Sequence, residues 1–130
     1  MNDALALVFD VGTQSVRAML FDAAGHIVRS AQDIYEQPYY SRNPNWAEQR
    51  PDFYFEHICI VSQRLKDQSP EDFARAASVA VTVFRDTTVC MGKDGRPLRD
   101  CILWMDQRRA EAAPGRTQGD LRARRYDGDR

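Results

Sequence analysis

The stretch LALVFDVGTQSVRAMLFD, residues 5–22, determines how the rest of this 130-residue chain is interpreted. It begins with five apolar residues, reaches a carboxylate at Asp10, turns at residues 12–15 and then becomes apolar again. Two apolar runs joined by a short turn predict a β-hairpin, with alternate side chains on opposite faces. Because the first run is apolar at every position, we expect that strand to be buried on both faces.

Further strands extend this hairpin into a sheet. A turn containing Gly25 leads into residues 26–34, which are more polar and predict a third antiparallel strand nearer an edge. Residues 78–84 (SVAVTVF) predict another buried strand, and residues 101–104 predict a short one. Three strands followed by helices and a further strand predict an α/β domain with a mixed sheet covered by helices.

The segment after residue 50 predicts an amphipathic helix. Pro51 suits its first turn, and Asp52 suits its positive end. The apolar stripe consists of Tyr54, Ile58, Val61 and Leu65, and is widened by Phe55 and Cys59. Ser69 as N-cap and Pro70 at the first position predict a second, short helix, and residues 106–113 are also predicted to be helical.

Composition narrows the class of protein. A chain with 43% hydrophobic and 28% charged residues is typical of a soluble globular domain. The net charge of -1 argues against binding to nucleic acid or an anionic membrane. Apolar runs are too short to span a bilayer and no signal peptide is evident, so we expect a cytoplasmic location. Cys59, Cys90 and Cys101 lack CxxC spacing and are expected to be buried free thiols.

The character of the chain changes at its end. Residues 114–130 (PGRTQGDLRARRYDGDR) contain five Arg, three Asp and three Gly with few apolar residues. Such a composition predicts disorder, because little apolar surface is available for burial. A truncation or a shifted reading frame is the other interpretation, in which the tail is non-native. We therefore expect a domain over residues 1–113 and a disordered or non-native tail over residues 114–130.

The turn of the hairpin carries groups that suit phosphate. The motif Asp10-x-Gly12-Thr13-x-Ser15 lies between two strands, which excludes a P-loop or Rossmann fingerprint because both need a following helix. Turn N–H groups and hydroxyls can still bind phosphate, Asp10 suits Mg²⁺ through water, and Arg17 suits a phosphate oxygen. An ordinary hairpin turn, with Asp and Gly chosen for turn geometry, explains the same residues.

Four segments change the balance between these interpretations. They are FDVGTQSVRAMLFD (9–22), WAEQRP (46–51), FRDTT (84–88) and KDGRPL with ILWMDQR (93–98 and 102–108). The first resembles the phosphate motif of the actin, sugar kinase and Hsp70 superfamily, and the others resemble motifs of the FGGY carbohydrate kinases. Asp86 departs from the Q-R-E-T pattern of glycerol kinases, which have Glu there. Trp46 and Glu48 are expected to fix the entry to the following helix.

The resemblance implies a fold, cofactors and site residues. The fold is the ribonuclease H-like (actin-like ATPase) α/β fold, present incompletely as an N-terminal fragment. Asp10 would position Mg²⁺. The residues facing the ATP phosphates would be Gly12, Thr13, Gln14, Ser15 and Arg17. The residues contacting the sugar or polyol would be Arg85, Asp86, Trp104 and Asp106.

The chemistry of the substrate residues agrees with that assignment. An Arg donor beside a carboxylate acceptor matches two neighbouring hydroxyls, and an indole face packs against C–H groups. Two plainer interpretations remain open: Arg85 and Asp86 form an exposed ion pair of little value, and Trp104 belongs to the core. His26 and His57 are lone histidines, for which we expect structural roles.

The resemblance also limits what this chain can do. Phosphoryl transfer needs a base for the attacking hydroxyl, which in the family is an Asp in a later stretch. We therefore expect no catalytic residue here and an inactive fragment of an ATP-dependent sugar or polyol kinase. We also expect faces meant for absent segments to promote self-association. A non-catalytic polyol- or nucleotide-binding module is the alternative, and an actin-like assembly protein is a third class that the sugar-binding residues disfavour.

Overall fold

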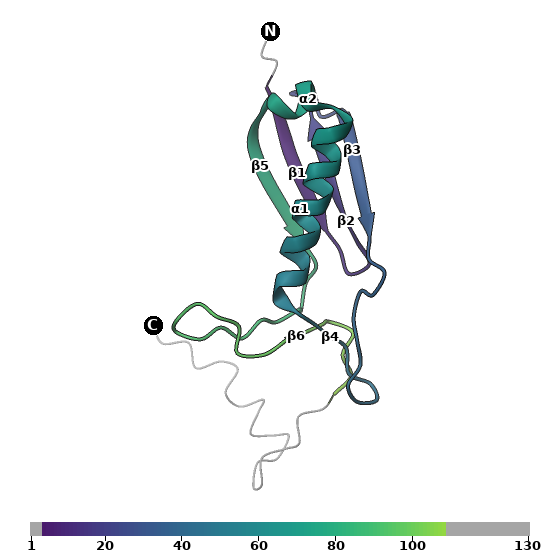
Figure 1. The fold of residues 1–130 in the computed structure, drawn as a ribbon, viewed down its shortest axis with the longest axis vertical. Helices are drawn as coiled ribbons and strands as arrows, with labels where there is room; N and C mark the ends of the chain where they lie inside the picture. The colour runs from purple at the N-terminus through teal and green to yellow at the C-terminus, as the bar shows by residue number, and fades with distance from the viewer. Residues whose placement is uncertain (1–3, 109–130) are drawn as a thin grey trace, which may run out of the picture.

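The computed structural model describes residues 4–108. Its main sheet contains β1 (Leu5–Val11), β2 (Ser15–Phe21), β3 (Ile27–Ile34) and β5 (Ala76–Val83), in the spatial order β3-β2-β1-β5 (Figure 1). Neighbouring strands pair antiparallel from β1 to β3, whereas β1 and β5 pair parallel. The predicted antiparallel meander within a mixed sheet is therefore confirmed. The sheet is open, with β3 and β5 at its edges.

The main core lies between this sheet and α1 (Pro51–Gln68), which runs along one face of it (Figure 1). Every second residue of β1 and β2 points toward the helix, as the pleat of a strand requires. The buried side chains are Leu5, Leu7, Phe9, Val11, Val16, Ala18, Leu20, Ala31, Tyr35, Val61 and Leu65. Removal of this apolar surface from water is the dominant force that holds the helix to the strands.

β1 is buried on one face only, which corrects the prediction that both faces would be covered. Its odd-numbered residues are buried, whereas Ala6, Val8 and Asp10 on the other face are partly exposed. α1 supplies one covering layer, and within residues 4–108 no helix lies over the opposite face. An apolar strand can tolerate burial on both sides, but its sequence does not show that a second layer is present.

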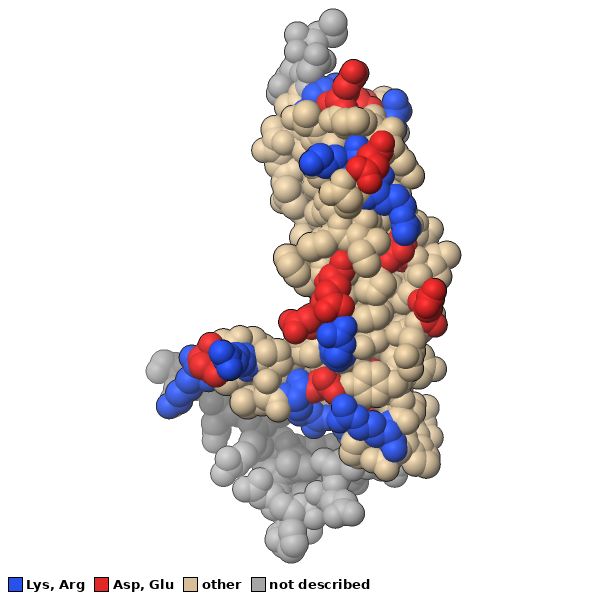
Figure 2. Space-filling view, viewed as in Figure 1, with Lys and Arg blue, Asp and Glu red and all other residues tan. Residues whose placement is uncertain are grey.

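β5 is also exposed, so the prediction of a buried strand over residues 78–84 was wrong about its burial. The strand exists, but every residue after Ala76 is exposed. Its register places Val79, Val81 and Val83 on the same face as the buried residues of β1. α1 packs against β1, β2 and β3, so this apolar row lies beyond its reach. Figure 2, seen from the same side as Figure 1, shows no charged side chains on the surface over β5.

The predicted stripe of α1 is confirmed, but it is narrower than expected. Its buried or half-buried members are Tyr54, Ile58, Val61 and Leu65. Phe55 is 69% exposed and Cys59 is exposed, so the prediction that they widen the buried stripe was wrong. Both point to the side that the sheet does not cover.

α2 (Pro70–Ala74) follows α1 directly, as predicted, with Pro70 in its first turn. Ser69 occupies the N-cap position, but its hydroxyl donates to the Asp72 carboxylate at 2.7 Å and makes no capping bond to a backbone N–H. Within residues 4–108, neither helix is long and apolar enough to cross a membrane.

The three cysteines are free, but only one is buried. Cys101 is fully buried, as expected, whereas Cys59 and Cys90 are exposed, which corrects the prediction that all three thiols are buried. Cys59 is exposed because it lies beside the covered stripe of α1. Cys90 is exposed because it belongs to the irregular segment that follows β5.

A smaller unit lies at the N-terminal end of α1 (Figure 1). β4 (Glu48–Gln49) and β6 (Cys101–Ile102) pair antiparallel over a second core of Ala47, Cys101 and Leu103. The strand predicted at residues 101–104 is thus confirmed in shortened form. The predicted helix at residues 106–113 is not, because residues 106–108 are not helical; residues 109–113 lie outside the described part of the chain.

Glu48 connects the parts of this smaller unit. Its side chain is 3% exposed and pairs with Arg99 at 2.8 Å and with Arg108 at 3.0 Å. The Arg108 guanidinium also lies 3.8 Å from the centre of the Trp46 ring. A buried carboxylate needs such partners, because an unpaired one would carry a large desolvation penalty. Trp46 and Glu48 therefore act structurally just before α1, as expected.

Candidate functional site

The turn between β1 and β2 is tight and held by backbone bonds. The N–H of Gly12 donates to the carbonyl of Ser15 at 2.9 Å, and the N–H of Tyr35 donates to the carbonyl of Gln14 at 3.0 Å. A Cβ on Gly12 would lie 3.2 Å from the Ser15 carbonyl oxygen, closer than most Cβ contacts. Glycine therefore permits the tight turn, which presents Thr13 and Gln14 at its tip.

Asp10 lies at the end of β1 between two neighbours on adjacent strands. In the register of the sheet it faces Arg17 on β2 and Thr82 on β5. The Thr82 hydroxyl donates to Asp10 Oδ1 at 3.1 Å, and Arg17 Nη1 lies 3.6 Å from Asp10 Oδ2. The Asp10 and Arg17 side chains are both about half exposed, so a ligand in solvent can reach the carboxylate.

A second group of predicted residues lies where the chain leaves β5. Phe84, Arg85, Asp86 and Trp104 line a hollow of about 260 Å³. Asp86 has a φ of +59°, in the left-handed region of the backbone. Trp104 is 57% exposed, so the plainer interpretation that it belongs to the core does not hold. No ion pair between Arg85 and Asp86 is found among the described residues.

These two groups of residues meet through one hydrogen bond. The indole Nε1–H of Trp104 donates to the Thr13 hydroxyl at 3.0 Å, across a separation of 91 positions. The backbone N–H of Trp104 in turn donates to the Thr87 hydroxyl at 3.3 Å. The structure thus brings the hairpin turn and the hollow side by side, although they come from opposite ends of the described chain.

Asp106 lies apart from this hollow. Its side chain is 2% exposed and accepts the backbone N–H of Ala47 at 2.6 Å, and it forms a two-point pair with Arg108. The hydrogen bonds from Arg108 lower the pKa of Asp106 to about 2, against the opposing effect of burial. This carboxylate therefore links Ala47 and Arg108 within the smaller unit, and it does not line the hollow.

Two residues of the site were missed from the sequence. Thr82 orients Asp10 and Thr87 holds Trp104. Thr82 lies in none of the sequence motifs, whereas Thr87 belongs to the segment FRDTT (84–88) but was not predicted to have a role of its own. The alternation of residues 78–84 was the available signal, because it places Thr82 on the face opposite the three valines. Its pairing with Asp10 depends on a parallel register across 72 positions, which no local pattern specifies.

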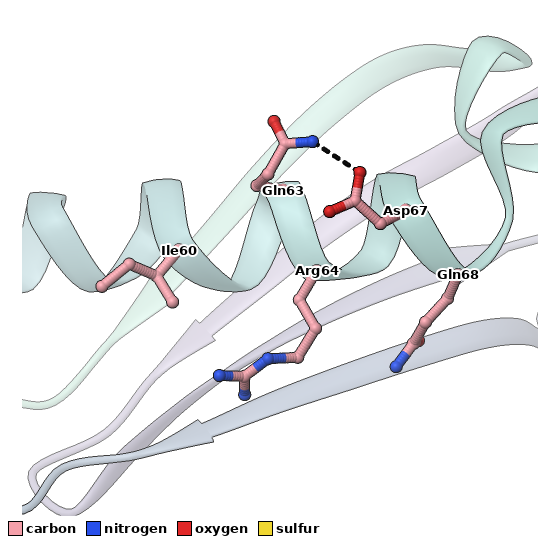
Figure 3. Close-up of a pocket in the computed structure, with 5 residues that line it drawn as sticks. All are labelled: Ile60, Gln63, Arg64, Asp67 and Gln68. Carbon is pink, nitrogen blue, oxygen red and sulfur yellow. Dashed lines mark hydrogen bonds between the residues drawn. The ribbon is translucent and has the colours of Figure 1, made fainter.

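Another open hollow, of about 560 Å³, lies along the C-terminal half of α1 and contains none of the predicted site residues. Ile60, Gln63, Arg64, Asp67 and Gln68 line it (Figure 3). Gln63 donates to Asp67 at 2.7 Å, while Arg64 extends toward β3 and pairs with Asp33 at 3.0 Å. Gln63 and Asp67 thus bond to each other and Arg64 bonds to β3, so these side chains do not converge on a ligand.

The donors present suit a phosphate-bound cation better than a metal held by protein alone. Within residues 4–108, no three His, Cys, Asp or Glu side chains gather closely enough to hold a metal ion. Asp10 is the one carboxylate at the hairpin turn, and it is accessible. Mg²⁺ is commonly bound by one or two carboxylates together with substrate phosphates and water. Asp10 therefore fits such an ion.

Comparison with solved structures defines the class of protein. A xyloylose kinase from Brucella ovis matches with a TM-score of 0.75 and 27% identity over 80% of this chain and 22% of that one. The xylulose kinase from Rhodospirillum rubrum matches with a TM-score of 0.72 and 27% identity, over 80% of this chain and 21% of that one. The chain thus has the fold of actin-like ATPase sugar kinases, as the resemblance implied.

Comparison of sequences then gives the family. Residues 5–119 match the model of the N-terminal domain of the FGGY family of carbohydrate kinases, and the chain belongs to that family. It is 33% identical to a glycerol kinase from Burkholderia vietnamiensis over 125 residues, which are 95% of this chain and 25% of that protein. A glycerol kinase from Burkholderia cenocepacia is 34% identical over 112 residues. The chain spans about a quarter of the length of these relatives.

Proposed function

We propose that this chain supplies the phosphate-binding hairpin and part of the acceptor wall of an ATP-dependent sugar or polyol kinase. The observation that carries the proposal is the hydrogen bond between Trp104 and Thr13, which joins the hollow lined by Arg85 and Asp86 to the turn between β1 and β2. Transfer of a γ-phosphate to a carbohydrate hydroxyl requires that acceptor and phosphate lie side by side. Family membership supports a sugar kinase domain.

In this proposal the hairpin holds the phosphates of ATP·Mg²⁺. Mg²⁺ would neutralise charge on the phosphate oxygens when bound, and Asp10 is the residue that would hold it. The Thr82 hydroxyl orients the Asp10 carboxylate by donating to it. The ATP-facing residues are those predicted from the motif: Gly12, Thr13, Gln14, Ser15 and Arg17. Arg17 lies directly across β1–β2 from Asp10, so it is positioned to meet a phosphate beside the same carboxylate.

The hollow at the end of β5 takes the acceptor. Arg85 donates and Asp86 accepts, which matches two neighbouring hydroxyls, and the exposed ring of Trp104 offers an apolar face. Because Asp86 is one methylene shorter than the Glu of glycerol kinases, the particular sugar or polyol is left open. Asp106 is the weakest member of the predicted set, since its carboxylate is already satisfied by Arg108.

We further propose that the 130-residue chain alone does not catalyse phosphoryl transfer from ATP. The described residues at the hollow include no free carboxylate other than Asp86, which serves better as a substrate ligand than as a base. The chain also covers only about a quarter of its glycerol kinase relatives. Its fold boundary at residue 113, its cytoplasmic location and its lack of nucleic-acid or membrane partners remain predictions, as does self-association through exposed faces.

Calorimetry with the full chain tests this function. Glycerol, xylitol and D-xylulose are titrated with and without ATP·Mg²⁺, and a coupled assay measures ADP release. We expect binding without turnover, a loss of polyol binding in Arg85→Gln, and weaker ATP·Mg²⁺ binding in Asp10→Asn with polyol binding retained. Polyol-dependent ADP release would overturn the inactivity. Binding of neither ligand would overturn the proposed site, and binding of polyol alone would favour a non-catalytic module.

A further inference from the structure

We infer that Trp104 couples the two halves of the site: its indole N–H orients the Thr13 hydroxyl toward phosphate, so that filling the hollow strengthens nucleotide binding. The inference deepens the proposed function and rests on it. It assigns to Trp104 a positioning role in phosphate binding, beyond the apolar contact with the acceptor. It also assigns to Thr87 the role of holding Trp104 in place.

The direction of the hydrogen bond is fixed by chemistry. An indole N–H can only donate, so Thr13 Oγ1 must act as the acceptor in this contact. The hydroxyl proton of Thr13 is then free to point elsewhere. An ionised phosphate oxygen can only accept, and a hydroxyl that already accepts from Trp104 is therefore prepared to donate to it. This orientation makes Thr13 a phosphate donor before any ligand arrives.

The position of Trp104 allows it to sense the acceptor. Trp104 is 57% exposed and lines the hollow together with Arg85 and Asp86. An exposed ring retains rotamer freedom, which a packed carbon skeleton would remove. The backbone of Trp104 is already held by the Thr87 hydroxyl, so the remaining freedom is in the side chain. Restricting that side chain stabilises the bond to Thr13.

The coupling follows from the shared bond. A polyol that holds the indole in place lowers the entropy cost of presenting the Thr13 hydroxyl to phosphate. By linkage, a phosphate that engages Thr13 must strengthen polyol binding by the same factor. One net hydrogen bond sets the scale, so we expect a mutual gain in affinity of about 2- to 10-fold.

The experiment uses ¹⁵N NMR of the full chain, whose two tryptophans give two indole resonances. Trp46→Phe and Trp104→Phe assign them. We expect the Trp104 resonance, but not that of Trp46, to shift in Thr13→Val and to return in Thr13→Ser, which keeps the hydroxyl. Ser15→Ala is the matched control, because Ser15 is a neighbouring hydroxyl in the same turn that accepts from the Gln32 side-chain amide at 3.0 Å and does not contact Trp104.

Binding is then measured separately. ³¹P line broadening reports ATP·Mg²⁺ binding with and without a saturating polyol from the glycerol, xylitol and D-xylulose panel. We expect the 2- to 10-fold gain in the parent chain and in Thr13→Ser, and a gain of about 1-fold in Thr13→Val and Trp104→Phe. Trp104→Phe removes the N–H donor and keeps an aromatic face, although a smaller one, and Thr13→Val removes the acceptor while the indole stays intact.

The outcomes separate the two ideas. If both ligands bind but the gain is absent, or if Thr13→Val and Trp104→Phe keep it, the coupling is wrong while the proposed function stands. If the Trp104 resonance does not respond to Thr13→Val in a folded chain, the bond is absent in solution and the coupling fails. If neither ligand binds the parent chain, the proposed function fails and the coupling fails with it.

Discussion

At the scale of single residues, the site contains groups that a motif could identify and groups that only the fold could. Asp10, Thr13 and Trp104 lie in motifs, and the structure brings them to one place. Thr82 was not predicted, because its contact with Asp10 depends on a pairing between strands far apart in the chain. Asp106 was predicted for the substrate, but its motif did not reveal that Arg108, two positions on, would occupy its carboxylate.

Asp106 should make the stability of the chain depend on acid. Its pKa is about 2 when folded, below the ordinary value of 3.8, because Arg108 donates to it. A lowered pKa contributes stability that is present above about pH 4 and is lost as the pH falls toward 2. Asp106→Asn should therefore lower the free energy of unfolding at pH 5 by on the order of 2 kcal/mol, and by much less near pH 2.

Urea unfolding of both proteins between pH 5 and pH 2 measures this difference. Asp94→Asn is the control, because Asp94 lies on an exposed turn. If the difference in unfolding free energy between Asp106→Asn and the parent chain stays constant with pH, then Arg108 does not lower the pKa of Asp106 and the prediction is wrong.

At the scale of elements, periodicity predicted which side chains of α1 face the sheet but not the width of the covered surface. Val61 and Leu65 are buried as the spacing requires, while Phe55 points away. The apolar sequences of β1 and β5 likewise predicted strands correctly and burial incorrectly. Hydrophobicity shows that burial would be favourable, whereas actual burial depends on a covering layer, and one helix covers only part of one face.

Two substitutions on α1 should differ sharply. Leu65→Ala removes a fully buried side chain and should cost about 2–5 kcal/mol of unfolding free energy through lost burial and a cavity. Phe55→Ala removes a larger but exposed side chain and should change stability by no more than about 0.5 kcal/mol. Urea denaturation followed by circular dichroism measures both. A comparable cost for Phe55→Ala would mean that its ring is covered in solution.

At the scale of the whole molecule, the two edges of the sheet differ in a way that predicts association. β3 carries Arg29, Gln32 and Asp33, and such polar and charged residues commonly protect an edge. β5 has no charged residue and exposes three valines beside unpaired backbone groups. An unprotected apolar edge of this kind readily pairs with another strand, so we expect β5 to be the surface through which the chain self-associates.

A charge on β5 should weaken that association. We expect Val81→Lys to lower the average mass in light scattering across a concentration series, because a lysine cannot be buried cheaply between paired strands. Ile34→Lys, which places the same charge on an exposed residue of β3, should have little effect. A parent chain that is monomeric at every concentration and unfolds in one sharp transition would contradict the prediction.

The left-handed backbone at Asp86 has a consequence for changing the acceptor. Asp tolerates a positive φ better than most residues, because its short side chain bonds locally. Restoring the Glu of glycerol kinases would extend the carboxylate by one methylene and would also place a less suitable residue on a strained backbone. Under the proposed function, acceptor choice and loop conformation are thus joined at Asp86. An engineer who wishes to alter the specificity of this hollow must reshape the loop together with the side chain.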